Sequence, residues 1–151
     1  MCKQASTWLA FLFGSRMNAK FESSIKAIPY PQERIFSFLA DFDHFGDLVP
    51  KDKISNWSSQ GDSCRFTVDG IGEVGLRIVE KELHKTIKYT AEGKTPFNFF
   101  LWVQLKEVAE SDSRLKLTIK ADLNPMLKMV AAGPIKKFLE MLADGMAAHK
   151  Y

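Results

Sequence analysis

The chain has 151 residues, a length that fits a single domain with a substantial core. Its composition, 46% hydrophobic and 26% charged, is that of an ordinary globular protein. The net charge of +3 is mild, and the 21 basic residues are interleaved with 18 acidic ones, so no continuous basic stripe is available for a phosphate backbone. Nucleic acid is therefore not the expected partner.

The two cysteines, Cys2 and Cys64, lie far apart and show no zinc-binding spacing. This usage favours a reducing, cytoplasmic compartment. In the stretch SCRFTV, Cys64 alternates with Phe66 and Val68. We therefore expect it to be a small buried hydrophobic residue rather than a reactive thiol.

Residues 1–19 are expected to be an N-terminal extension outside the core fold, with a single domain over residues 20–151. The apolar run from Trp8 to Phe13 is too short to span a bilayer and is followed by no clear cleavage site. Met17 opens MNAKFESSIKAI, which has the pattern of a first strand. We interpret the preceding segment as an extension or an upstream start. A secretion signal or a peripheral membrane anchor is the alternative.

A strand and two short helices are predicted next. The stretch KFESSIKAI alternates, which predicts a half-buried strand with one face made of Phe21, Ser23, Ile25 and Ala27. Pro29 and Pro31 end this strand, and Pro31 suits the first turn of a helix. The apolar positions of the helix recur at helical spacing; they are Ile35, Phe38, Leu39 and Phe42. The stretch DFDHFGDLVP predicts a second short helical turn.

Six further strands follow, in KISNWSS, SCRFTVDG, EVGLRIVEKE, KTIKYTAEG, FNFFLWVQLKEV and SRLKLTIKADL. The last of them alternates cleanly, with an apolar face made of Leu115, Leu117, Ile119, Ala121 and Leu123. One dry and one wet face, joined by short connections, indicate an antiparallel sheet.

The C-terminal stretch predicts one long helix. Asn124 can cap it and Pro125 suits its first position. Pro134, after Gly133, is expected to kink it. The helix presents an apolar stripe made of Ile135, Phe138, Leu139, Leu142 and Met146. The chain is therefore expected to adopt an α+β helix-grip fold, a seven-stranded curved antiparallel sheet wrapped around a long C-terminal helix, with two short helices after the first strand.

The element order and the stretch FSFLADFDHFGDLVP resemble the START-like, or Bet v 1-like, superfamily, including its polyketide cyclase/dehydrase and coenzyme Q-binding branches. The motif positions are Leu39, Asp41 and Phe42, followed by Leu48, Val49 and Pro50. Many relatives carry tryptophan at the position of Leu48. The resemblance covers about residues 20–150. The superfamily contains lipid carriers, plant allergens, hormone receptors, aromatase/cyclases and chaperone activators. Independently of the resemblance, a strongly curved sheet around a single helix encloses more volume than the helix fills, so the fold is expected to contain a cavity.

The acidic segment Asp41, Asp43, His44 and Asp47 admits two interpretations, a metal or acid–base site and an amphipathic lid. On a short helix these side chains pair in two different directions and do not converge as metal ligands must. We therefore predict a lid, whose apolar side closes the cavity mouth and consists of Phe42, Phe45, Leu48 and Val49.

A ligand is expected between the dry sheet face and the C-terminal helix. The predicted contact residues are Tyr89, Phe66, Leu76, Ile78, Leu117, Met129, Phe138 and Leu142. Tyr89 is the polar candidate, because its hydroxyl could orient a ligand. The alternative is a core tyrosine bonded to the backbone. Entry is expected to depend on residues 41–50 and on Gly133–Pro134. We expect no catalytic residue, no cofactor and no metal.

The stretch FNFFLWVQL is apolar on both faces, so Phe100 and Trp102 are expected to form an exposed apolar patch. Three interpretations remain open: packing by the N-terminal segment, a homodimer or partner surface, and a bulge that turns one ring inward.

The predicted function is binding or transport of a small hydrophobic molecule that is a lipid, a fatty acid, quinone-like or polyketide-like. The alternative is a polyketide cyclase/dehydratase-type enzyme that uses the same cavity; binding is favoured because no titratable pair stands on the apolar faces. A small apolar molecule is the expected partner, without stable membrane insertion.

Overall fold

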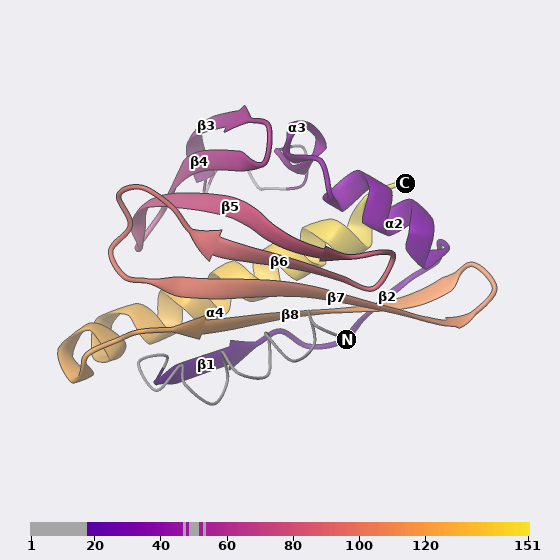
Figure 1. Ribbon diagram of the computed structural model, residues 1–151. Helices are drawn as coiled ribbons and strands as arrows, with labels where there is room; N and C mark the ends of the chain where they lie inside the picture. Colours follow the sequence, from indigo (N-terminus) through magenta and orange to yellow (C-terminus); the bar gives the residue numbers. More distant parts are fainter. Residues whose placement is uncertain (1–17, 47, 49–51, 53) are drawn as a thin grey trace.

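The computed structural model describes residues 18–46, 48, 52 and 54–151 (Figure 1). Within them the chain forms eight strands and three helices. In chain order these are β1 (Ala19–Glu22), β2 (Lys26–Ile28), α2 (Gln32–Leu39), α3 (Phe42–Phe45), β3 (Ile54–Gln60), β4 (Ser63–Val68), β5 (Gly72–Glu82), β6 (Thr86–Ala91), β7 (Phe99–Ala109), β8 (Asp112–Ala121) and α4 (Pro125–Ala148).

All strands join one antiparallel sheet in the order β1-β8-β7-β6-β5-β4-β3, and β2 also pairs with β8. Since β1 and β2 lie end to end along β8, the sheet has seven strand positions, as predicted. Helix α4 crosses behind this sheet in Figure 1, and α2 and α3 lie near the C-terminal end of α4. The α+β helix-grip prediction is confirmed. Of the expected extension, only Asn18 and Ala19 are described, and Ala19 is the first residue of β1.

The first strand is interrupted, which the alternation did not predict. Ser23 replaces regular pairing with a side-chain bond: its Oγ accepts from the Leu117 amide at 2.9 Å, and its own amide donates to the Leu117 carbonyl at 2.9 Å. The break shifts the register by one residue. The expected inward positions Ile25 and Ala27 are therefore exposed, and Ile28 is fully buried instead.

The pattern of β8 is confirmed, because all five residues of its predicted apolar face are buried. The start of α4 is also as predicted: the Asn124 side chain accepts a hydrogen bond from the Leu127 amide at 2.7 Å. The helix is continuous through Pro134, so the proline does not divide it into two helices. No helix in the described part of the chain is both long and apolar enough to cross a bilayer.

The outer face of β7 differs from the expected exposed patch. Phe100 is half-buried, but Trp102 is only 7% exposed within the single chain. Lys88 on the neighbouring strand lies over both rings, with its Nζ 4.5 Å from the Phe100 centroid and 5.5 Å from that of Trp102. The two aromatic side chains therefore do not form an open apolar surface.

Candidate ligand-binding site

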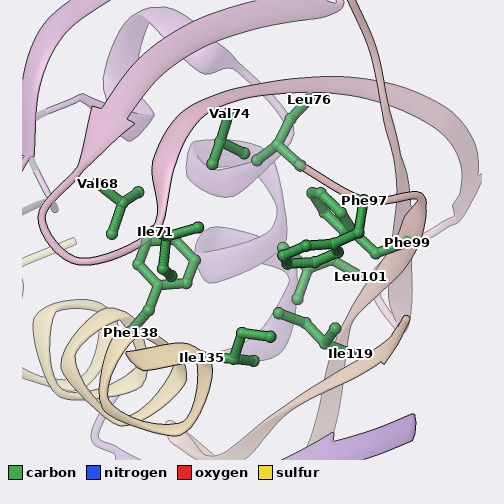
Figure 2. A pocket seen from close by; sticks show the side chains of 10 residues that line it. All are labelled: Val68, Ile71, Val74, Leu76, Phe97, Phe99, Leu101, Ile119, Ile135 and Phe138. Atoms are coloured by element: carbon green, nitrogen blue, oxygen red, sulfur yellow. The ribbon is translucent and has the colours of Figure 1, made fainter. Parts of the chain in front are cut away.

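An apolar cavity lies between the sheet and α4, near the end of the sheet formed by the β4–β5 turn and the β6–β7 loop (Figure 2). Its lining side chains come from β4, the turn after it, β5, the loop before β7, β7 itself, β8 and α4. They are Val68, Ile71, Val74, Leu76, Phe97, Phe99, Leu101, Ile119, Ile135 and Phe138. None of these ten described side chains carries a polar atom, as Figure 2 shows.

Simple local rules bring these residues together. Strand alternation turns Val74 and Leu76 inward from β5, and Ile135 and Phe138 share one face of α4 at i, i+3. Ile71 points inward from a tight turn between two glycines. Gly70 and Gly72 adopt φ values of 84° and 115°, which side-chain-bearing residues rarely adopt.

The hollow is small in this conformation. The cavity volume is only about 20 Å³, about the space that one water needs. Neighbouring rings fill much of the interior, with Phe97 and Phe99 centroids 5.7 Å apart and Phe66 and Phe138 centroids 6.1 Å apart. The expected large hollow between sheet and helix is therefore mostly occupied by side chains.

The residues predicted to contact a ligand fall into three groups. Leu76 and Phe138 line the cavity. Met129 is 85% exposed on the outer side of α4 and lies away from the cavity. The others belong to the buried core without lining the hollow; they are Phe66, Ile78, Tyr89, Leu117 and Leu142. The turn residue Ile71 was not among the predicted contacts, although an apolar residue between two glycines was a visible signal.

Tyr89 is fully buried, and its hydroxyl donates to the Leu39 carbonyl at a long 3.4 Å. Its ring lies 5.6 Å from that of Phe42. Burial raises the pKa of the Tyr89 hydroxyl above its usual value, so the group is neutral. Burial likewise raises the pKa of the free Cys64 thiol to about 12, which makes this cysteine inert as a nucleophile.

The predicted lid residues Phe42, Phe45 and Leu48 are buried over the other end of the core, and Val49 lies outside the described residues. Phe45 stacks on Trp57 with centroids 5.9 Å apart. The end covered by α3 is thus closed by aromatic packing, and the apolar cavity lies toward the opposite end of the sheet, not beneath α3 (Figures 1 and 2).

The polar residues of this segment have local structural partners. Asp41 caps α3 by accepting from the Asp43 amide at 2.9 Å, and Asp43 accepts from the Ser59 hydroxyl at 3.0 Å. The His44 ring stacks on Phe38 with centroids 4.8 Å apart. Asp47 lies outside the described residues. Within the residues that the structure describes, no group of three or more His, Cys, Asp or Glu side chains is arranged to hold a metal ion.

No protein-family model and no curated protein sequence matches the chain. Solved structures do match. Norcoclaurine synthase from Thalictrum has a TM-score of 0.66 at 10% identity, over 85% of this chain and 91% of that one. A START superfamily protein from Mycobacterium smegmatis has a TM-score of 0.63 at 12% identity, over 85% and 94%.

A conserved protein from Geobacillus kaustophilus has a TM-score of 0.65 at 10% identity, over 85% of this chain and 93% of that one. Identities this low carry information about architecture alone. The matches extend over 85% of this chain and at least 91% of each of these structures, so they concern the described domain as a whole. The chain therefore has the START-like, or Bet v 1-like, helix-grip fold.

Proposed function

We propose that the chain binds a small hydrophobic molecule, a lipid, fatty acid, quinone-like or polyketide-like compound, in the cavity between the sheet and α4. The observation that carries this proposal is the entirely apolar lining of a hollow that reaches the surface. Ile71 and Phe97 are the only half-buried side chains of the lining, so we place the opening beside them. START-like folds commonly bind hydrophobic ligands, which supports the same proposal.

A ligand of this kind needs more room than the closed cavity offers. We assign the expansion to the turn bearing Ile71 and to the loop bearing Phe97, because they surround the opening and are less buried than the rest of the lining. Binding is driven by burial of apolar surface, worth roughly 25 cal/mol per Å² before the cost of ordering is subtracted. Phe42, Phe45 and Leu48 act as the fixed cover of the opposite end.

A cyclase or dehydratase would need an acid or base that reaches the bound molecule. The described lining supplies only aliphatic and aromatic side chains, so no observation favours this second function. Norcoclaurine synthase, one of the structural matches, is named for an enzymatic activity, but that activity is a property of that protein. The free, buried thiol of Cys64 is consistent with a reducing compartment, so we propose that the protein acts in the cytoplasm.

Titration with the fluorescent fatty acid cis-parinaric acid tests the proposal. The variant Ile71→Trp places a bulky ring at the cavity opening, where the native side chain is only half-buried, and should weaken binding by at least about tenfold. Ile25→Trp is the matched control, because Ile25 is 66% exposed and outside the lining, and it should bind as the wild type does.

Native mass spectrometry of protein purified from its own host should in addition show a co-purified hydrophobic compound. If the wild type shows no saturable binding of the probe, or if both tryptophan variants bind with equal affinity, the proposed site is wrong.

A further inference from the structure

Two neighbouring strands, β7 and β8, carry a group of side chains on the side of the sheet that faces away from α4. Leu101 of β7 and Ile119 of β8 line the cavity together with residues of α4. Strand alternation therefore turns their chain neighbours to the opposite, outer side of the sheet. Four of these neighbours form what we call the outer patch: Phe100, Trp102, Thr118 and Lys120. They are adjacent in the β7–β8 register, in which Trp102 pairs with Thr118.

The outer patch is more buried than the outer side of a single sheet should be. Trp102 is 7% exposed and Thr118 is 6% exposed, although tryptophan is so large that it is rarely buried this completely. Loss of water around Lys120 also lowers the pKa of its ammonium below the usual value. Phe100 and Lys88 flank the Trp102 ring. Both belong to the same sheet and lie beside the ring, whereas burial of this depth requires atoms above it.

The chain enters the sheet next to the outer patch. Asn18 is held at the edge of the sheet by Leu123: its side chain accepts from the Leu123 amide at 2.9 Å and donates to the Leu123 carbonyl at 2.5 Å. Two residues later, Lys20 pairs with Lys120 of the outer patch. Since β1 and β7 are separated by β8 alone, the chain before Asn18 starts roughly 10 Å from Phe100.

The sequence before Asn18 fits this position. Residues 1–17 lie outside the described residues, but they contain the apolar run Trp8–Phe13 within an uncharged stretch from Gln4 to Ser15. The five peptide steps from the end of the run to Asn18 can span up to roughly 17 Å when extended. The run can therefore reach the outer patch, and the intervening Gly14–Ser15 suits the reversal of direction that this path requires.

We propose that the run Trp8–Phe13 packs over the outer patch of its own chain. The aromatic side chains of the run offer large apolar faces to Phe100 and Trp102. The run brings no charge into the contact, so its burial leaves no carboxylate or ammonium without water. The contact lies on the side of the sheet opposite the ligand cavity, so it is independent of the proposed ligand binding.

A tether and the surrounding charge favour the chain's own segment over a second copy. A segment attached this close to its site has an effective concentration in the millimolar range, which a second copy does not reach at ordinary protein concentrations. A symmetric dimer through two outer patches would also bring Lys88 and Lys120 against the same residues of the partner, which is unfavourable.

Fluorine NMR of the full chain labelled with 5-fluorotryptophan tests the proposal. The chain has three tryptophans, Trp8, Trp57 and Trp102, and single tryptophan-to-phenylalanine variants assign their resonances. The difference in chemical shift between H₂O and D₂O measures the contact of each ring with water. In the wild type we expect this isotope shift to be at least about threefold smaller at both Trp8 and Trp102 than in the urea-unfolded chain.

The variant Leu9→Asp/Leu12→Asp should remove the cover, because carboxylates are costly to bury. The isotope shift of Trp102 should then rise at least about threefold. Gln4→Asp/Ser15→Asp is the matched control, since it adds the same charge outside the run, and it should leave Trp102 unchanged. Trp57 stacks on Phe45 in the core, so its unchanged resonance reports that each variant is folded.

The reciprocal variant is made on the sheet. Trp102→Ala should raise the isotope shift of Trp8, because the run loses the ring on which it packs. Lys106→Ala, at an exposed residue on the same side of β7, is the control and should leave Trp8 shielded.

Several results would overturn the proposal. One is a wild-type Trp8 with the isotope shift that it has in urea, a measurement that needs no variant. Another is a Trp102 that stays shielded in Leu9→Asp/Leu12→Asp, and a third is equal behaviour of test and control variants. Exposure of Trp102 on dilution, with a matching fall of the mass measured by light scattering, would assign the cover to a second copy instead.

Discussion

Tyr89 carries a polar group in a fully buried position. Its hydroxyl donates to the Leu39 carbonyl at the C-terminal end of α2, and its ring packs between Phe42 and Phe45 at centroid distances of 5.6 and 6.2 Å. The residue therefore joins the sheet to the two short helices. Its hydroxyl lies outside the set of atoms that line the cavity.

The variant Tyr89→Phe separates a structural role from a ligand-binding one. Since the 3.4 Å bond is long, its loss should lower the free energy of unfolding by about 1 kcal/mol or less, measured by urea denaturation. Affinity for cis-parinaric acid should not change. A loss of affinity with unchanged stability would instead show that the hydroxyl reaches the ligand.

Among the elements, α4 contains two interior glycines with opposite surroundings. A Cβ at Gly145 would lie 2.3 Å from the Leu48 carbonyl oxygen, so the helix backbone packs directly against the segment that follows α3. A Cβ at Gly133 would meet nothing within 4 Å. The first glycine is needed for close packing, and the second only weakens the helix.

The variants Gly145→Ala and Gly133→Ala should therefore have opposite effects. Gly145→Ala must move α4 or the α3 segment and should destabilise the protein by about 2 kcal/mol. Gly133→Ala should stabilise it by up to about 1 kcal/mol, because alanine favours the helix. Thermal unfolding of the pair gives the comparison, and equal shifts of the two midpoints would contradict the close approach at Leu48.

At the scale of the whole molecule, a network of charged and polar groups joins the N-terminal strand segment to the C-terminal helix α4. Glu140 of α4 accepts from the Ser24 amide at 2.5 Å and from the Ser24 hydroxyl at 3.0 Å. Lys26 lies 3.3 Å from Glu140 and 2.7 Å from Asp144. The break in the first strand therefore has a function in the fold, because it presents the Ser24 amide to α4.

This network predicts a pH dependence. The Ser24 amide, followed by the Ser24 hydroxyl and Lys26, holds the pKa of Glu140 below its usual value. The stabilisation is therefore complete above about pH 4.3, the pKa of an unfolded glutamate, and is lost as the pH falls through the lower folded-state pKa. Glu140→Gln should be less stable than the wild type at pH 7, by at most about 1 kcal/mol since the site is exposed to solvent.

The difference between these two proteins should disappear in strong acid, as measured by urea denaturation across the acid range. Glu110→Gln, at an exposed carboxylate elsewhere, is the control and should follow the wild type at each pH. A constant difference between Glu140→Gln and the wild type at every pH would show that the carboxylate charge does not matter.

Periodic features of this fold were predictable from the sequence. The alternation of β8 and the Asn124–Pro125 start of α4 rest on local rules that the rest of the fold does not override. The break at Ser23 was not predictable, since it depends on a bond to Leu117, which is distant in the sequence. The position of Lys88 over the Trp102 ring depends on a neighbouring strand in the same way.

The sequence predicts which side chains point toward the interior, but it does not predict where the cavity lies. Alternation identifies Leu76 as inward-pointing, but whether an inward side chain borders empty space depends on packing between elements distant in the chain. Met129 shows the converse limit. A methionine on an amphipathic helix resembles a ligand contact in the sequence, yet its position on the outer side of α4 leaves it in solvent.

The pairing of β1 with β8 also determines when the first strand can join the sheet during translation. Ala19 lies opposite Ala121, so the first strand waits for about a hundred more residues before its partner exists. At translation rates of roughly 5–20 residues per second this delay is on the order of 5–20 s. The β3–β8 hairpins can assemble as they emerge, whereas Phe21 and the short helices stay uncovered until the last strand and helix leave the ribosome. The nascent chain is thus most exposed to aggregation and chaperone capture at its oldest end.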